Sequence, residues 1–267
     1  MNMKLSIGQI SIILLTLVVV GCFSPDELSE VPRIGYVSSH FYRVPDDYVP
    51  KDETDNPRDS ILITFTLEDG DGDIGLRSND VDNLYPYHPY NTIIDSRGEK
   101  VRFGGDYQLP FYKVNEQQGF RDSLFFSDVD NRPTSYDCKY FILDEELTGN
   151  TNQDSAVFIE QNIYGKNLIV DILRKQNGNY TSVDYAEYTN SINCDLYSLS
   201  GRIPIFDDDN LGRTLKGEIS YSIPSTGHVY VLNRDTFKIR FYVFDRALNQ
   251  SNVVESPDLT LQEILVD

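Results

Sequence analysis

Two segments of the chain have a large apolar residue at every second position, and this period of two restricts the fold more than any other feature. The segments are 61–67 and 237–244, in which every second side chain is Ile, Phe, Leu or Val. Such alternation is typical of β-strands with one buried face. Shorter candidate strands are Asn167–Leu173, Gly217–Ile223, His228–Leu232, Asn252–Val254 and Leu259–Leu261. No long amphipathic helix is evident, although Asp154–Asn162 could form a short one.

Short strands separated by polar turns predict an all-β, antiparallel sandwich. The 267 residues are enough to bury a core, and 40% hydrophobic with 24% charged residues is ordinary globular composition. Forty-two acidic against 23 basic residues give a net charge of −19. Because such a surface repels nucleic acid and anionic headgroups, we expect no nucleic-acid partner.

The amino terminus predicts export and lipidation. A basic start is followed by an apolar run, densest at Ile10–Val20, which at about 1.5 Å per residue is too short to cross about 30 Å of hydrocarbon. We therefore interpret residues 1–21 as a signal peptide that is removed. Val19-Val20-Gly21-Cys22 resembles the lipobox of bacterial lipoproteins, which implies that Cys22 carries the lipid, palmitate among its chains. The alternative is a general secretory signal with an unrelated cysteine.

The residues after the cysteine indicate a location. Phe23-Ser24-Pro25-Asp26-Glu27 resembles the acidic stretch that directs Bacteroidetes lipoproteins to the outer face of the outer membrane. The resemblance implies a surface-exposed, lipid-anchored protein of the outer membrane. An inward-facing periplasmic lipoprotein is the alternative.

Five further motifs resemble a Bacteroidetes lipoprotein family with one immunoglobulin-like sandwich, and they cover about a third of the chain. They are Asp69–Gly75 (DGDGDIG), Asn167–Val170, Gly201–Pro204, Lys216–Ile219 and Asp245–Val254. The resemblance implies a lipidated cysteine, acidic tether and first strand in 22–58, and the sandwich in 59–267. Residues 76–165 lie outside these motifs, and we expect a long insertion there between the second and third strands. A second small β domain is the alternative.

The segment Asp69–Gly75 also matches the dinucleotide pattern Gly-x-Gly-x-x-Gly, but its aspartates would face a pyrophosphate and 76–86 is a poor helix. A calcium loop fits better. Asp69, Asp71 and Asp73 occupy the first, third and fifth positions of such a loop, and Asp80 the twelfth. Carboxylates two residues apart, with glycines between them, can turn several oxygens towards one hard cation. We therefore expect Ca²⁺, with a solvated acidic turn as the alternative.

Topology adds two candidate ligands. If Ser60–Leu67 is the second strand and Phe237–Phe244 the sixth of an immunoglobulin-like sandwich, both strands run towards the same pole. The loops that follow them are then neighbours. We expect Asp245 and Asn249 to add oxygens to the metal site, although a tight polar hairpin is an equally good interpretation of that loop.

Cys138 and Cys194 remain after lipidation of Cys22, and in an oxidising envelope they are a possible disulfide or two buried thiols. The three histidines form no metalloprotease motif, and no Gly-x-Ser-x-Gly is present. We therefore expect no enzyme, with a hydrolase that uses an unrecognised carboxylate site as the alternative.

Tyrosines suggest a binding surface. Tyr85, Tyr87 and Tyr90 cluster in the expected insertion, and tyrosine combines flat apolar area with a polar tip. The absence of tryptophan favours a protein over a glycan partner, and packing within the fold is the alternative role of these rings. The sequence as a whole predicts a lipid-anchored, calcium-stabilised surface lipoprotein that serves as a binding or accessory subunit of an outer-membrane assembly. A carbohydrate-binding lipoprotein of a glycan-uptake system is the rival prediction.

Overall fold

The computed structural model describes residues 28–52, 55, 57–80, 86–115, 120–123, 140–143, 156–185, 199–206, 212–225 and 227–266. Strands dominate these residues, and all nine pairings between named strands are antiparallel. The all-β class predicted from the period of two is confirmed. Within the same residues, no helix combines the length and apolar character needed to span a membrane.

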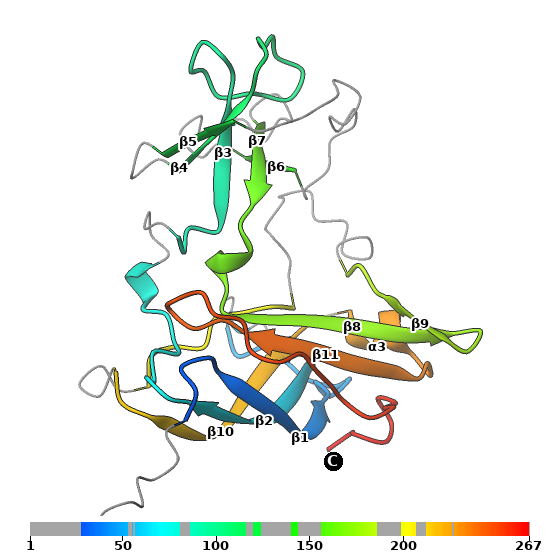
Figure 1. Cartoon of the computed structure of the whole chain (residues 1–267). Coiled ribbons are helices and arrows are strands. Elements are labelled where there is room, and N and C mark those ends of the chain that lie inside the picture. The colour runs from blue at the N-terminus through cyan, green and yellow to red at the C-terminus, as the bar shows by residue number, and fades with distance from the viewer. Residues whose placement is uncertain are drawn as a thin grey trace, which may run out of the picture.

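Two sheets form the sandwich (Figure 1). In the first, β2 (Ser60–Asp69) lies between β1 (Arg33–Tyr42) and β10 (Leu215–Pro224). The second has the order β12 (Val254–Glu255), β11 (Phe237–Val243), β8 (Leu168–Gln176) and β9 (Asn179–Ser182). Counted along the chain, strands one, two and five form one sheet and strands seven, six, three and four the other, which is an immunoglobulin-like arrangement. β2 and β11 are the second and sixth strands, as predicted.

The core lies between these sheets and consists of the inward positions of the period-two strands. Ile61, Ile63, Phe65 and Leu67 of β2 are buried, as are Phe237, Ile239, Phe241 and Val243 of β11. The rings of Phe65 and Phe241 meet across the sandwich with centroids 5.3 Å apart. Because each such side chain contributes about 1.5–3 kcal/mol on burial, this face fixes the register of both strands.

Five strands between β2 and β8 form a third sheet, which we call the inserted sheet. They are β3 (Tyr90–Ile94), β4 (Tyr112–Asn115), β5 (Phe120–Ser123), β6 (Phe141–Leu143) and β7 (Ala156–Gln161), in the order β5-β4-β3-β7-β6. The sheet has an apolar cluster of its own that includes Ile93, Phe111 and Phe158. The segment in which the sequence predicts an insertion therefore contains a separate sheet with a separate core. Figure 1 shows this sheet above the sandwich.

Three local predictions were wrong. His228–Leu232 is a short helix, α3, and not a strand; its buried His228 contacts Tyr185 and Ile223, and Asn233, with a positive φ of 43°, ends it. The described part of Asp154–Asn162, residues 156–162, contains β7 and no helix, since β7 pairs with β3 and β6. We expected the acidic run from Asp46 to Asp59 to belong to the tether, but its described residues, 46–52, 55 and 57–59, follow β1 and precede β2 of the same sheet.

α3 is fixed in the core by His228. The ring is fully buried, with Nε2 2.8 Å from the carbonyl oxygen of Ile223 and Nδ1 3.0 Å from the hydroxyl of Tyr185. Because a carbonyl only accepts, Nε2 carries the hydrogen, and Nδ1 of the neutral ring accepts from Tyr185. Burial lowers the pKa of His228 below 6.5, although the Ile223 carbonyl and Asp59 favour the charged form.

This lowered pKa predicts acid destabilisation. Below about pH 6.5 His228 is protonated in the unfolded chain but stays neutral in the folded one. Each further pH unit of acidification therefore lowers the free energy of unfolding by up to about 1.4 kcal/mol. Urea unfolding between about pH 7.5 and 5.5 measures this slope. His228→Gln is expected to be less stable at neutral pH and to lose the part of the slope that His228 contributes, while Asp69 and Asp73, whose pKa values are raised, contribute with the opposite sign in both proteins. An equal slope in both proteins would contradict the assignment.

Candidate metal centre

Two aspartates continue the inward faces of the two period-two strands. Asp69 follows Leu67 on β2, and Asp245 follows Val243 of β11, each at the next inward position. Both side chains are accordingly buried, with 0% and 2% of the residue exposed. The pattern that builds the core therefore places one carboxylate from each sheet at the same pole of the sandwich.

The loop after β2 brings two more carboxylates to this pole. Asp69, Asp71 and Asp73 each offer an oxygen, and these atoms lie within 4.8 Å of one another. Gly72 makes the turn possible, because its φ is +61° and a Cβ there would lie 1.7 Å from the carbonyl oxygen of Arg213. We call residues 69–75 the carboxylate loop.

Three buried oxygens in this loop have no hydrogen-bond donor in the described part of the chain. Among the described residues, no donor reaches either carboxylate oxygen of Asp69 or the Oδ1 atom of Asp71. A buried charge without a partner is costly, so it needs a proton or a cation. Two unit charges about 5 Å apart repel each other by about 3 kcal/mol at an effective dielectric constant of about 20.

The same crowding raises pKa values. Burial, followed by the charges of Asp71 and Asp73, raises the pKa of Asp69 to about 7. Burial, followed by the charge of Asp245, raises the pKa of Asp73 to about 6. Burial also raises the pKa of Asp245 above its ordinary value, against the hydrogen bonds from Asn249. The cluster therefore holds more negative charge than its surroundings compensate.

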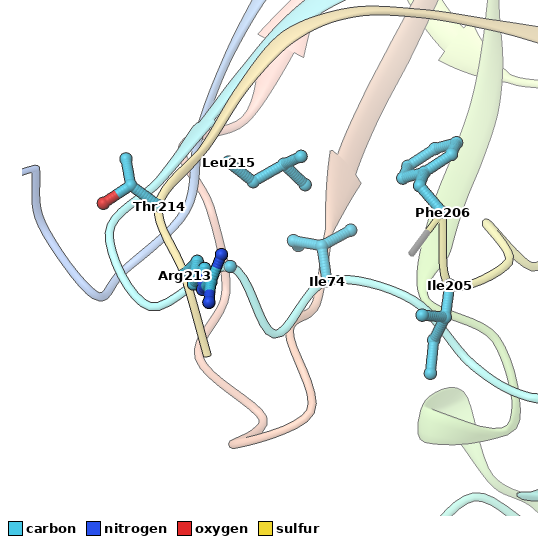
Figure 2. A pocket seen from close by; sticks show the side chains of 7 residues that line it. Ile74, Ile205, Phe206, Arg213, Thr214 and Leu215 are labelled. Carbon is cyan, nitrogen blue, oxygen red and sulfur yellow. The ribbon is translucent and has the colours of Figure 1, made fainter. Parts of the chain in front are cut away.

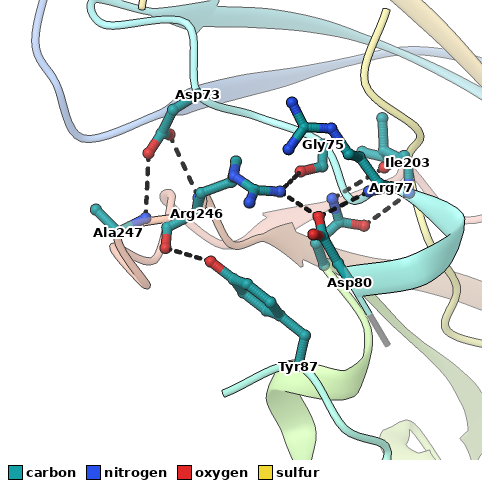
Figure 3. A network of polar contacts seen from close by, with 9 residues as sticks. Asp73, Gly75, Arg77, Asp80, Tyr87, Ile203, Arg246 and Ala247 are labelled. Atoms are coloured by element: carbon teal, nitrogen blue, oxygen red, sulfur yellow. Dashed lines mark hydrogen bonds and ion pairs between the residues drawn. The ribbon is translucent and has the colours of Figure 1, made fainter. Parts of the chain in front are cut away.

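The loops after β2 and β11 touch, as the sandwich topology predicts. The backbone N–H of Arg246 donates to Asp73 Oδ1 at 3.3 Å, and that of Ala247 to Oδ2 at 3.1 Å (Figure 3). Asp73 and Ala247 are 174 positions apart. The expected meeting of the two loops is confirmed, whereas the role of Asp245 as a metal ligand stays a prediction.

Asn249 lies against Asp245 as a donor. Its backbone N–H donates to Asp245 Oδ1 at 2.7 Å, and its side-chain nitrogen to Oδ2 at 2.8 Å. These two bonds close the hairpin and orient the carboxylate, in agreement with the alternative interpretation of this loop as a tight polar turn. A contribution of the Asn249 oxygen to the metal stays a prediction.

Asp80, at the twelfth position of the calcium-loop pattern, has another partner. Its carboxylate accepts from the guanidinium of Arg246 and from the backbone N–H of Arg77. Burial is the largest influence on the pKa of Asp80 and raises it, but the hydrogen bonds from Arg246 and Arg77 and the charges of both arginines together outweigh burial, so the pKa is lowered. Sequence reasoning missed Arg246, although it stands beside Asp245 in the last motif.

A cavity of about 300 Å³ borders the carboxylate loop (Figure 2). Most of the residues that line it are apolar, and Arg213 is the charged residue among them. The lining residues are Gly72, Ile74, Ile205, Phe206, Arg213, Thr214 and Leu215. The cavity lies next to the site, and Ile74 and Gly72 belong to both.

Of the remaining predicted site residues, two lie within the described part of the chain and four lie outside it. Tyr87 is buried, and its hydroxyl donates to the carbonyl oxygen of Arg246 at 2.6 Å, so this ring packs within the fold, whereas Tyr90 is partly exposed in β3. The others lie outside the described residues, and they are Cys22, Tyr85, Cys138 and Cys194.

The chain has no match among protein-family models, curated proteins or solved structures.

The unpartnered carboxylate predicts an unusual stability profile in chelator. Because Asp69 keeps a proton up to about pH 7 when folded but only to 3.8 when unfolded, the stability of the metal-free protein should fall as the pH rises between these values. Asp69→Asn removes the charge and should raise the unfolding free energy at pH 7.5 by at least about 1 kcal/mol.

The measurement is urea unfolding in excess chelator. Asp171→Asn is the matched control, because Asp171 pairs with Arg240 on a partly exposed face and its loss should not stabilise the protein. If Asp69→Asn destabilises the chelated protein, Asp69 has a compensating partner and the interpretation fails.

Proposed function

We propose that the carboxylate loop binds Ca²⁺, and that the protein is a calcium-stabilised, lipid-anchored lipoprotein on the outer face of the outer membrane. There it serves as a binding or accessory subunit of a larger assembly. One observation carries the calcium proposal: in the part of the chain that the structure describes, the buried oxygens of Asp69 have no donor and lie within a group of carboxylates.

The donor set favours calcium over other metals. Asp69, Asp71 and Asp73 offer carboxylate oxygens alone, the ligands of hard cations, whereas zinc sites draw on histidine and cysteine. Ca²⁺ accepts six to eight oxygens at about 2.3–2.6 Å in flexible geometry, while Mg²⁺ demands a near-ideal octahedron and retains several waters. A loop that offers several carboxylates at unequal burial suits the larger ion.

The expected role of the ion is structural. A cation among Asp69, Asp71, Asp73 and Asp245 joins the end of β2 in one sheet to the end of β11 in the other. It removes the repulsion that the packing of the core imposes on these side chains. The lipid anchor rests on the lipobox at Cys22, and β1 begins only at Arg33, so a short segment connects the sandwich to the membrane.

Calcium is expected to raise the melting temperature of the protein and chelator to lower it. An ion that binds only the folded state adds RT ln(1 + [L]/Kd), about 2.7 kcal/mol at a hundredfold excess over Kd. The double variant Asp71→Asn, Asp73→Asn should lose this shift. Differential scanning calorimetry and titration calorimetry measure both quantities.

The matched control is Asp46→Asn, Asp47→Asn, which removes the same charge from the exposed β1–β2 loop and should retain the shift. Asp245→Asn tests the second loop and should weaken calcium binding by at least about tenfold. If calcium produces neither heat nor a change in melting temperature, the loop is a solvated turn. If only Asp245→Asn is without effect, the ion binds the first loop alone.

The anchor has its own test. Cys22→Ser removes the sulfur that would carry the lipid, so we expect loss of fatty-acid labelling and release from the membrane fraction. Fractionation of cells grown with a labelled fatty acid measures both. Protease treatment of intact cells then distinguishes outward from periplasmic orientation. A labelled, membrane-bound variant would contradict the lipobox assignment.

A further inference from the structure

We propose that calcium at the carboxylate loop fixes the orientation of the inserted sheet on the sandwich, and that Arg246 transmits this effect. The inference rests on the proposed calcium site. It adds that the ion controls how the chain presents a whole sheet to a partner, besides stabilising the sandwich.

The main chain of Arg246 contacts the carboxylate loop. Its N–H and that of Ala247 each donate to one oxygen of Asp73. These two bonds hold the β11 loop to the side chain that would bind the ion. The position of Arg246 therefore depends on where Asp73 is held.

The side chain of Arg246 contacts the base of the inserted sheet. Figure 3 shows its guanidinium donating to Asp80, which precedes the connection to β3, and also to the carbonyl oxygen of Gly75 in the carboxylate loop, the latter at 3.4 Å. It also lies 5.4 Å from the centre of the Tyr87 ring, while the Tyr87 hydroxyl donates to the Arg246 carbonyl. One residue thus contacts both the candidate ligand Asp73 and the segment that leads into β3.

The two connections to the inserted sheet are tied to each other. Asn162, in the segment that returns to the sandwich, donates through its side chain to the carbonyl oxygens of Pro86 and His88 at 2.6 and 2.8 Å. Tyr87 lies between these two residues. A contact that fixes Tyr87 therefore also fixes Asn162, and with it both segments that join the inserted sheet to the sandwich.

Repulsion supplies the driving force. Without a cation, the carboxylates of Asp69 and Asp71, whose oxygens lie within 4.8 Å of that of Asp73, repel it, and a displaced Asp73 loses its bonds to Arg246 and Ala247. With a cation, attraction replaces repulsion and these bonds persist. The ion therefore binds more tightly when Asp73 keeps its bonds to Arg246 and Ala247 than when these bonds are lost. Such a difference in affinity is what coupling requires.

The calcium concentration would then control the orientation in which the inserted sheet meets its partner. Extracellular calcium modules bind with Kd values of about 10⁻⁴–10⁻³ M, which matches a protein that meets calcium only after export. The partner of the inserted sheet would find it in one orientation outside the cell.

Hydrogen exchange with mass spectrometry, on the mature protein in detergent with and without Ca²⁺, tests the coupling. Calcium should slow exchange of the amides of Tyr87, His88 and residues 162–166 by about five- to 150-fold, since Pro86 and Pro89 carry no amide hydrogen. Arg246→Met keeps the backbone N–H groups that hold Asp73, so it should bind calcium within about threefold of the original affinity and yet lose most of this slowing. Arg240→Met, on β11 but paired with Asp171, should keep it.

Tyr87→Phe removes one hydroxyl and gives a milder variant in case Arg246→Met does not fold, and it should lose part of the slowing. If calcium binds the original protein without slowing exchange in 86–89 and 162–166, the coupling is overturned and the calcium site stands. If the slowing survives in both variants, Arg246 is not the link and the inference fails. If calcium does not bind at all, the proposed function fails together with the inference.

Discussion

Repulsion among carboxylates at one pole of the sandwich is the constraint on which the rest of the structure depends. Asp69 and Asp245 are buried there for the same reason that Phe65 and Phe241 are, because all four occupy inward positions of strands with a period of two. A shift of either strand by one residue would expose the aspartate, but it would also expose the core face. The apolar core therefore forces the charges together, and their neutralisation must come from another source.

This dependence explains why the site is built from two sheets. A loop confined to one hairpin could relax by opening towards solvent, whereas Asp73 is held by the N–H groups of Arg246 and Ala247 from the opposite sheet. The hairpin after β11 is in turn fixed by the bonds between Asn249 and Asp245. A bound cation would therefore act on the joint between the sheets and not on one loop alone.

Much of this arrangement could be predicted from the sequence, because the period of two and the order of the strands follow from local patterns. The burial of Asp69 and Asp245 could also have been read from the same period, carried one step beyond Leu67 and Val243. Other features depend on distant contacts. The helical state of His228–Leu232 depends on partners of His228 in Tyr185 and Ile223, and the pairing of β7 with β3 and β6 has no local signature.

Arg246 was beyond sequence reasoning because its importance lies in the combination of its partners. It follows Asp245 directly, yet the two side chains serve different parts of the molecule: Asp245 lies with the buried carboxylates, while the Arg246 guanidinium binds Asp80 beside Tyr87. A turn that reverses the chain at the end of β11 makes this division possible. Because neighbouring residues on one short turn contact the carboxylate cluster and Tyr87, which precedes β3, the proposed coupling needs no residue beyond this turn.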